Sequence, residues 1–284
     1  MNKSDSVRPS PIAGTWYNGN PQSLSSQIDG FLTGARDAEI RGRVIGLIVP
    51  HAGHRYSGRT AGYAYRTVQS QSPDIVVILS PLHAYYPGIL ITSAHRAYST
   101  PLGEVEIAEE ELQRMEFLLT RQGLRLERIL RDEEHSIEIQ LPFLQRALKK
   151  PFRLLPLMIR SRDEQTLKQV AESLALLLKD KNALLIASTD LSHFFPLEQA
   201  EMLDGEMLKR IKAFDPEAVL SAEESGSAAA CGAAAIAVVM WAARSLGAEQ
   251  ASILHYSTSA DTSGDATSVV GYGAAALTAA PVNA

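Results

Sequence analysis

The sequence predicts an α/β protein, in the form of a three-layer α/β/α sandwich with a largely parallel sheet. Short apolar runs rich in β-branched residues recur at 44–49, 75–79, 152–158 and 183–187, and each has the length of a buried strand. Helical patterns separate these runs, and such alternation requires crossovers that cover both faces of a sheet. With 45% hydrophobic residues in 284, the chain can form one large core, so we expect a single domain over residues 1–284.

We expect four helices between the strands, at residues 58–69, 136–149, 163–179 and 231–246. The pattern is clearest at 163–179, where apolar residues recur at helical spacing and charged residues fall on the opposite face. Ser161 and Glu164 fit a capping box at its start. The alanine-rich helix is expected to end near Gly247, since glycine is favoured just beyond a helix C-terminus.

Two further strands, at 251–257 and 268–276, are expected to complete the sheet. The stretch from 80 to 107 does not fit a simple alternation of strand and helix. We expect short additional strands or a hairpin excursion there. No internal repeat or linker interrupts the pattern.

Composition excludes several classes of function. The 27 Lys and Arg against 32 Asp and Glu give a net charge of −5, and no basic run is available to bind phosphates, so nucleic acid is not expected as a partner. The longest apolar run, 228–243, is shorter than the roughly 20 residues that span a bilayer, so a membrane is not expected either. The polar N-terminal stretch MNKSDSVRPSP has no apolar segment behind it, which predicts a cytoplasmic protein.

Histidines follow three of the predicted strands. His51 comes after the first strand, His83 after the second and His193 after the fourth, although the chain has only seven histidines. In open α/β sheets, ligands bind beyond the carboxyl ends of the strands. Taken singly, each histidine is more often a hydrogen-bonded loop residue than a ligand. The three together indicate a ligand-binding site.

Cys231 is the only cysteine, so no intramolecular disulfide can form. Three readings are open for its thiol: a packing residue among alanines, a nucleophile or a metal ligand. Its place at the start of an apolar helix favours a thiolate through the helix dipole. Imidazoles that converge with a thiolate or carboxylate suit Fe(II), Zn(II) or copper.

Two further segments carry candidate acid–base residues. His135 and Glu138 are three residues apart and share a face if the helix has begun there, so they form an acid–base pair, a support for metal ligands, or a helix cap. Asp190 and His193 can act as orienting carboxylate and general base, since histidine titrates nearest neutral pH. Asp190 fits a turn or helix cap equally well.

At these residues the sequence resembles the Memo family, also labelled AmmeMemoRadiSam system protein B. The matching motifs occur in order along the chain: AGTWY at 13–17, PHAG at 50–53, SPLH at 80–83, TPLG at 100–103, EHSIEIQLPFL at 134–144, STDLSH at 188–193, CG at 231–232 and VVGYGA near the C-terminus.

The resemblance implies a fold similar to the LigB-type class III extradiol dioxygenases, which are non-haem Fe(II) enzymes. It implies that His51, His83 and Cys231 bind a metal ion, that Asp190 and His193 lie at the same pocket, and that the segment with His135 and Glu138 lies nearby. The cysteine stands where the dioxygenases are expected to place a carboxylate. Because a thiolate is softer and donates more charge, ring-cleaving activity does not follow from the resemblance alone.

We therefore expect an Fe(II)-dependent oxidoreductase, dioxygenase-like, that acts on a small substrate, with copper or zinc as alternative metals. His193, Asp190, His135 and Glu138 are its candidate catalytic residues. Two alternatives stay open. One is a non-catalytic module that binds a peptide or protein in the same cleft. The other is a metal-assisted partner of a radical-SAM system.

Overall fold

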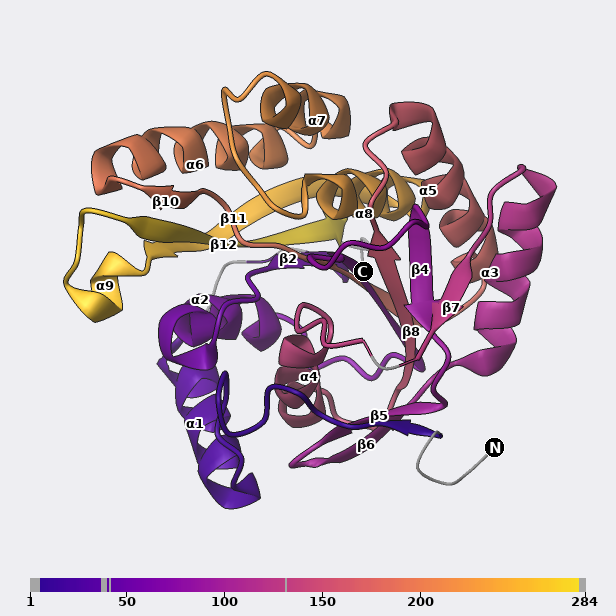
Figure 1. Cartoon of the computed structure of the whole chain (residues 1–284), viewed down its shortest axis with the longest axis horizontal. Coiled ribbons are helices and arrows are strands. Elements are labelled where there is room, and N and C mark those ends of the chain that lie inside the picture. Colours follow the sequence, from indigo (N-terminus) through magenta and orange to yellow (C-terminus); the bar gives the residue numbers. More distant parts are fainter. Residues whose placement is uncertain (1–5, 37–39, 41, 131, 281–284) are drawn as a thin grey trace.

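A mixed sheet of nine strands forms the centre of the computed structural model, which describes residues 6–36, 40, 42–130 and 132–280 (Figure 1). The strands follow the spatial order β10-β12-β2-β9-β3-β8-β4-β7, and β11 pairs with β12. Their bounds are β2 Val44–Val49, β3 Ile75–Pro81, β4 Leu90–Ser93, β7 Glu127–Ile129, β8 Arg153–Ile159, β9 Ala183–Ser188, β10 His193–Phe195, β11 Ala248–Thr258 and β12 Val269–Ala279.

Four strands at the centre of the sheet run parallel, and they are the four apolar runs that the sequence singles out. β2 pairs with β9, β9 with β3, and β3 with β8. Nearly all of their residues are buried, because helices cover both faces. Antiparallel strands extend this centre, β12 beside β2 and β4 beside β8. The expected α/β fold is confirmed, with its parallel part at the centre of a mixed sheet.

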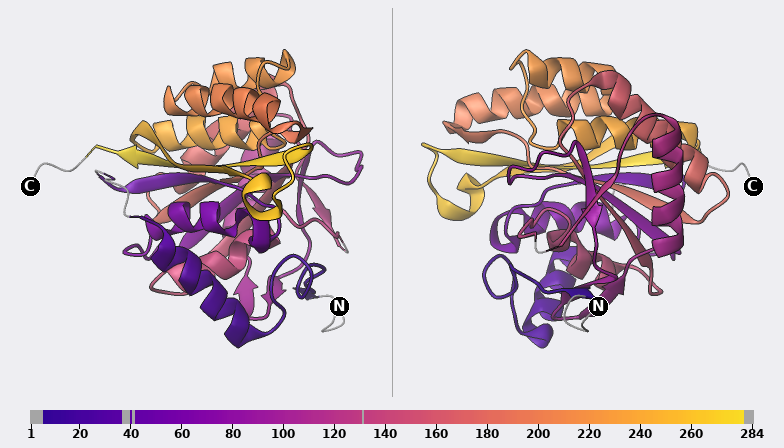
Figure 2. Two further views of the ribbon diagram at one scale, coloured as in Figure 1. Left: turned by 90° about the vertical axis from the view of Figure 1, so that its left-hand side faces the viewer. Right: turned by 45° about the vertical axis from the view of Figure 1, so that its right-hand side comes forward.

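Helices form a layer on each face of the sheet (Figures 1 and 2). One layer contains α1 Pro21–Gly34, α2 His54–Arg66 and α4 Leu141–Ala147. The other contains α5 Glu164–Leu178, α6 Leu197–Lys212, α7 Pro216–Glu224 and α8 Ala233–Ser245, and α3 Glu109–Arg121 packs against α5. The result is the three-layer sandwich that the alternation of strands and helices predicts.

Most predicted elements are present, with shifts in their ends. Asp163, not the expected Ser161–Glu164 box, caps α5: its carboxylate accepts from the Thr166 N–H at 2.8 Å. The helix expected at 136–149 is shorter and irregular, since a 3₁₀ turn over Glu138–Gln140 precedes α4. α8 ends before Gly247, whose φ of +97° favours glycine.

The stretch from 80 to 107 does form short extra strands, as expected. One of them, β4, joins the main sheet; β5 Ala97–Thr100 and β6 Gly103–Glu106 pair as a hairpin. β1 Val7–Arg8 adds to β5 in parallel and completes a small second sheet. Among the described residues, no helix is both long and apolar enough to cross a membrane.

Candidate metal centre

Three neighbouring strand ends position the first part of the site. His51, Asp190 and His83 each lie two residues beyond a strand, after β2, β9 and β3 respectively. Since these strands are adjacent and parallel, their carboxyl ends share one edge of the sheet. Cys231 reaches the same edge from the loop before α8. Its backbone N–H donates to the Asp190 carbonyl at 3.2 Å, which ties the two loops together.

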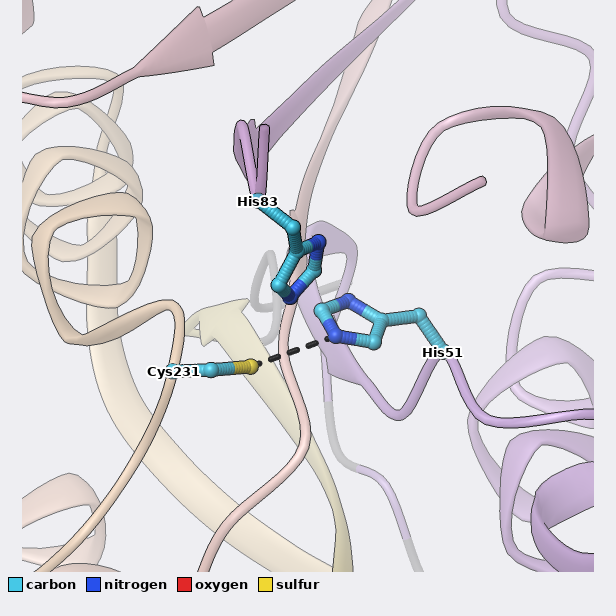
Figure 3. A group of neighbouring side chains, drawn as sticks. All are labelled: His51, His83 and Cys231. Carbon is cyan, nitrogen blue, oxygen red and sulfur yellow. Dashed lines mark hydrogen bonds between the residues drawn. The ribbon is translucent and has the colours of Figure 1, made fainter. Parts of the chain in front are cut away.

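His51, His83 and Cys231 point toward one another (Figure 3). Each offers one ligand atom, and the three atoms lie within 4.8 Å of one another. The His51 Nε2 is 3.2 Å from the Cys231 Sγ. Two such ligands on one tetrahedral metal ion, at about 2.0 Å for nitrogen and about 2.3 Å for sulfur, would be about 3.5 Å apart. The donor set and its spacing therefore fit a metal ion.

Ser188 fixes the tautomer of His51. Its hydroxyl donates to the Ser136 carbonyl at 2.6 Å and accepts from the Gln140 side-chain amide at 2.8 Å. The hydroxyl proton is thereby used, so at the 3.2 Å contact the Ser188 oxygen accepts from the His51 Nδ1–H. The proton of His51 is held on Nδ1, and the lone pair of Nε2 points at the thiol.

Glu134 holds the Nδ1 proton of His83, as Ser188 holds that of His51. Its carboxylate lies 3.0 Å from the His83 Nδ1 and also accepts from the His83 backbone N–H at 2.6 Å. The backbone N–H groups of His135 and Ser136 donate to it as well. Although burial acts to raise it, these hydrogen bonds hold the pKa of Glu134 well below its usual range. A fixed carboxylate behind a histidine is the usual support for a metal-bound imidazole.

The two candidate histidine ligands differ in their surroundings. Burial, with the neighbouring His135 and His83, lowers the pKa of His51 well below its ordinary value, so its imidazole stays neutral. The hydrogen bond to Glu134 raises the pKa of His83. The His83 side chain is 41% exposed, whereas His51 is almost fully buried. The site is therefore open on the side of His83.

Burial raises the pKa of the Cys231 thiol to about 12, and the nearby Asp190 carboxylate acts in the same direction. The Asp190 backbone N–H donates to the sulfur at 3.3 Å. The sequence predicts that a helix dipole lowers the pKa of this thiol. α8 begins only at Ala233, two residues beyond Cys231, and burial raises the pKa instead. Gly232 permits this approach, because a Cβ there would lie 2.7 Å from Thr189 Cβ and 2.8 Å from the Ser188 carbonyl oxygen.

Asp190 holds the loop of His51. Its carboxylate accepts from the backbone N–H groups of His51, at 2.7 Å, and Ala52, at 3.3 Å. Burial raises its pKa to about 7. The sequence left two roles open for Asp190, an orienting carboxylate and a turn cap, and these backbone contacts are those of a turn cap. Its other carboxylate oxygen lies 4.0 Å from the His51 Nε2.

His135 lies in the same cluster. Its ring stacks on His83 with centroids 4.8 Å apart and meets His51 edge-on at 5.3 Å. The Trp16 ring covers it from outside, at 4.1 Å between centroids. Burial lowers the pKa of His135 to about 4. With His83 and Glu134 it forms a second group of potential ligands, although Glu134 is already occupied by hydrogen bonds.

The structure does not bring Glu138 to the cluster. Its carboxylate pairs with Arg8 at 2.6 Å and accepts from the Tyr17 hydroxyl at 2.7 Å and from Ser10. Arg8 in turn donates to the Glu134 carbonyl at 2.6 Å. Glu138 therefore anchors the N-terminal segment, and among the described contacts no hydrogen bond joins its carboxylate to His135.

His193 begins β10 at the rim of the site. Its Nδ1–H donates to the Leu191 carbonyl at 2.9 Å, which leaves Nε2 as an acceptor in the neutral ring. Burial lowers the pKa of His193. The proximity of His193 also acts to lower the pKa of His51. Phe194, the next residue, has a φ of +63°, a strained conformation of the kind found near functional sites. No hydrogen bond joins His193 to Asp190 among the contacts described.

Sequence reasoning missed two of the residues that build the site. Glu134 and Ser188 hold the Nδ1 protons of the two candidate histidine ligands. A carboxylate directly before His135 was a usable signal for Glu134. Ser188 carried none, because a serine at the end of a strand is ordinary and its partner lies 137 residues away.

Known proteins resemble this chain along nearly its whole length. The profile of Memo-like proteins matches residues 8–276. A MEMO1 family protein of Nitrosopumilus maritimus is 33% identical over 273 residues, which cover 94% of this chain and 98% of the relative. Relatives from Methanopyrus kandleri, 34% identical with 93% and 96% covered, and Aquifex aeolicus, 33% identical with 94% and 97% covered, carry the same family name.

A crystal structure of an uncharacterized protein from Escherichia coli K12 has the same fold. It superposes with a TM-score of 0.51 at 15% identity, and the match covers 81% of this chain and 99% of that protein. At this identity the likeness concerns the fold alone. The family profile and the relatives, at about one third identity over almost the full length, together show that the chain belongs to the Memo family.

Proposed function

We propose that this chain binds one Fe(II) ion through His51 Nε2, His83 Nε2 and Cys231 Sγ, and that it acts as an oxidoreductase on a small organic substrate. One observation carries the proposal. Two imidazoles, each with its Nδ1 proton held by a buried acceptor, turn their free nitrogens toward the same thiol. Imidazole and thiolate ligands suit iron, and they accept copper and zinc as well.

A bound ion of this kind would supply a Lewis-acidic, redox-active centre with positions left open for a substrate. The chain's own groups have separate tasks. Ser188 and Glu134 orient the imidazoles, Asp190 fixes the loop of His51, and His193 can take up a proton at Nε2 because burial keeps its ring neutral. The fold and the hydrogen bonds thus hold the donor atoms ready before any ligand arrives.

Space for a substrate lies beside the donor atoms. A cavity of about 610 Å³ is lined by Leu82 and Cys231, and another of about 470 Å³ is lined by His83 and His135. Both volumes are in the range that takes a small organic molecule. The exposure of His83 supports access from this side.

Anaerobic titration with Fe(II), followed by metal analysis of the desalted protein, tests the proposal. We expect one ion per chain in the wild type and less than a tenth of that occupancy in the triple variant His51→Ala, His83→Ala, Cys231→Ser. His255→Ala is the matched control, because His255 bonds to Thr60 away from the cluster. Equal iron in the triple variant would refute the site.

Oxygen consumption by the iron-loaded protein, measured against a panel of small reductants, tests the second half of the proposal. Turnover that depends on His51, His83 and Cys231 is the expected result. Stoichiometric iron binding without turnover of any reductant in the panel would support the metal site and contradict the proposed oxidoreductase activity. The two halves of the proposal can therefore fail separately.

A further inference from the structure

The N-terminal segment, residues 8–17, contacts the candidate metal centre without offering it a ligand. Its first contact is made by Arg8, which is buried. The Arg8 guanidinium donates to the Glu134 carbonyl at 2.6 Å and to the Asp132 carboxylate at 2.8 Å, and it pairs with Glu138 at 2.6 Å. One buried cation therefore holds a single loop of the chain at three points.

These contacts fix the backbone that presents Glu134 to His83. The Glu134 carboxylate lies 3.0 Å from the His83 Nδ1, while the carbonyl of the same glutamate accepts from Arg8. Arg8 and His83 thus contact opposite ends of one residue. A shift of Arg8 would move the Glu134 backbone, and with it the carboxylate that orients the imidazole.

Trp16 makes the second contact, and it touches two loops at once. Its ring lies on His135 at 4.1 Å between centroids, and His135 stacks on His83 at 4.8 Å. The Trp16 backbone carbonyl accepts from the N–H of His54 at 2.8 Å, at the end of the loop that begins with His51. The N-terminal segment therefore links the loop after β2 to the loop that Arg8 holds.

We propose that Arg8 and Trp16 are positioning residues for the proposed metal centre. They hold His51 and His83 at the spacing that a metal ion requires, so metal affinity depends on a segment that donates no ligand. The hydrogen bonds at Nδ1 orient each ring separately, whereas the N-terminal segment fixes one loop relative to the other. Tight binding needs ligand atoms held within about 0.5 Å of their bound positions. The inference rests on the proposed metal site and deepens it.

Competition titration of Co(II) against a chromophoric chelator tests the role of Arg8. Arg8→Lys keeps a positive charge beside Glu138 but loses the planar group that contacts several partners at once. We expect Co(II) to bind at least about tenfold more weakly, as for other changes behind a metal-bound histidine. Leu174→Ala is the control, because it removes a buried side chain of α5, which packs against α3 and α8.

The control separates positioning from a contribution to stability alone. Stability alone predicts that the folded Arg8→Lys and Leu174→Ala proteins bind Co(II) with equal affinity, and that result would overturn the role of Arg8. A wild type that binds no Co(II) would instead remove the metal site itself, and the inference with it. The two failures can therefore be told apart.

Trp16 provides a test that leaves the buried ion pair intact, so it decides the question even if Arg8→Lys does not fold. Its side chain is 38% exposed. Trp16→Leu should weaken Co(II) binding about three- to tenfold, and Trp16→Phe should recover most of the affinity, because it restores an aromatic ring on His135. Trp241→Leu, at the only other tryptophan, is the control. Equal affinity of Trp16→Leu and Trp241→Leu would contradict the proposal.

Hydrogen exchange provides a readout that needs no substitution. Coupling between two sites is reciprocal, so a bound ion should in turn steady the N-terminal segment. Zn(II), which has no redox chemistry, is the probe. Peptides covering residues 8–17 should exchange more slowly in the Zn(II)-saturated wild type, with a smaller change over α3. Unchanged exchange over residues 8–17 in the saturated protein would overturn the coupling.

Discussion

The Glu134 carboxylate lies 3.0 Å from the His83 Nδ1 and 2.6 Å from the backbone nitrogen of the same residue, so one side chain fixes both the ring and the loop of His83. A histidine held in this way presents its Nε2 in a single orientation. The proposed iron site depends on that orientation as much as on the ligand itself.

Glu134→Gln should weaken metal binding about 10- to 100-fold, because the amide cannot support His83 as the carboxylate does. Competition titration with a chromophoric chelator measures the change. Glu133→Gln is the control, since Glu133 is exposed and adjacent in sequence. Equal affinity in the two variants would show that Glu134 does not act through His83.

Cobalt(II) offers a direct report on the thiol. Because Cys231 is the only cysteine, any thiolate-to-cobalt charge-transfer absorption must come from this residue. We expect the near-ultraviolet band in the wild type and its loss in Cys231→Ser, with His255→Ala unchanged. A cobalt-loaded wild type without this band would mean that the sulfur is not a ligand.

The buried ion pair of Arg8 and Glu138 should matter for stability. Both side chains are almost fully buried, so Arg8→Met leaves the carboxylate without its partner and should lower the free energy of unfolding by about 3–5 kcal/mol. Arg146→Met breaks an exposed pair with Asp29 and should cost less than about 1 kcal/mol. Urea denaturation measures both, and similar losses would contradict this account.

The buried His54 should make the free energy of unfolding depend on pH in the acidic range. Burial lowers its pKa to about 4 in the folded chain, while an unfolded histidine titrates near about 6.5. Between these values the unfolded chain binds the extra proton, so the contribution is complete above about pH 6.5 and is lost as the pH falls toward 4, by about 3 kcal/mol in all. His54→Gln keeps a donor for the Ile139 carbonyl and should flatten the pH dependence of stability in this window. An unchanged slope would be the contrary result.

Two phenylalanines with positive φ form a matched pair for substitution by glycine. Phe194 has φ +63° and is 74% exposed, whereas Phe214 has φ +56° and is 8% exposed. Glycine relieves the same backbone strain at both sites, of the order of 1 kcal/mol. Phe194→Gly should therefore keep or raise the melting temperature, while Phe214→Gly should lower it through lost burial. A lower melting temperature for Phe194→Gly would show that its ring is needed for packing.

The parallel centre of the fold could be predicted because its signal is local. The apolar runs of β2, β3, β8 and β9 are buried on both faces, so they stand out without any knowledge of their partners. The helices α1, α3, α6 and α7 lacked such a signal and were not predicted. In α6, for example, only four of sixteen residues are buried, which leaves a mainly polar pattern.

The residues of the candidate site also differ in how far a pattern in the sequence predicts them. His51 and His83 were found from their place after strands, which is a rule about topology. Glu138 was assigned to the site because it is one helical turn from His135, but the chain forms a 3₁₀ turn there and a buried arginine from the N-terminal segment holds the carboxylate. Arg8 is 130 residues from Glu138, and no local pattern reports a contact at that separation.

The distance along the chain between His51 and Cys231 has a consequence for biosynthesis. The cysteine is synthesised 180 residues after the histidine, so a growing polypeptide passes through a long stage without its full set of donor atoms. The proposed metal ion would therefore meet its full set of ligands only in an almost finished chain.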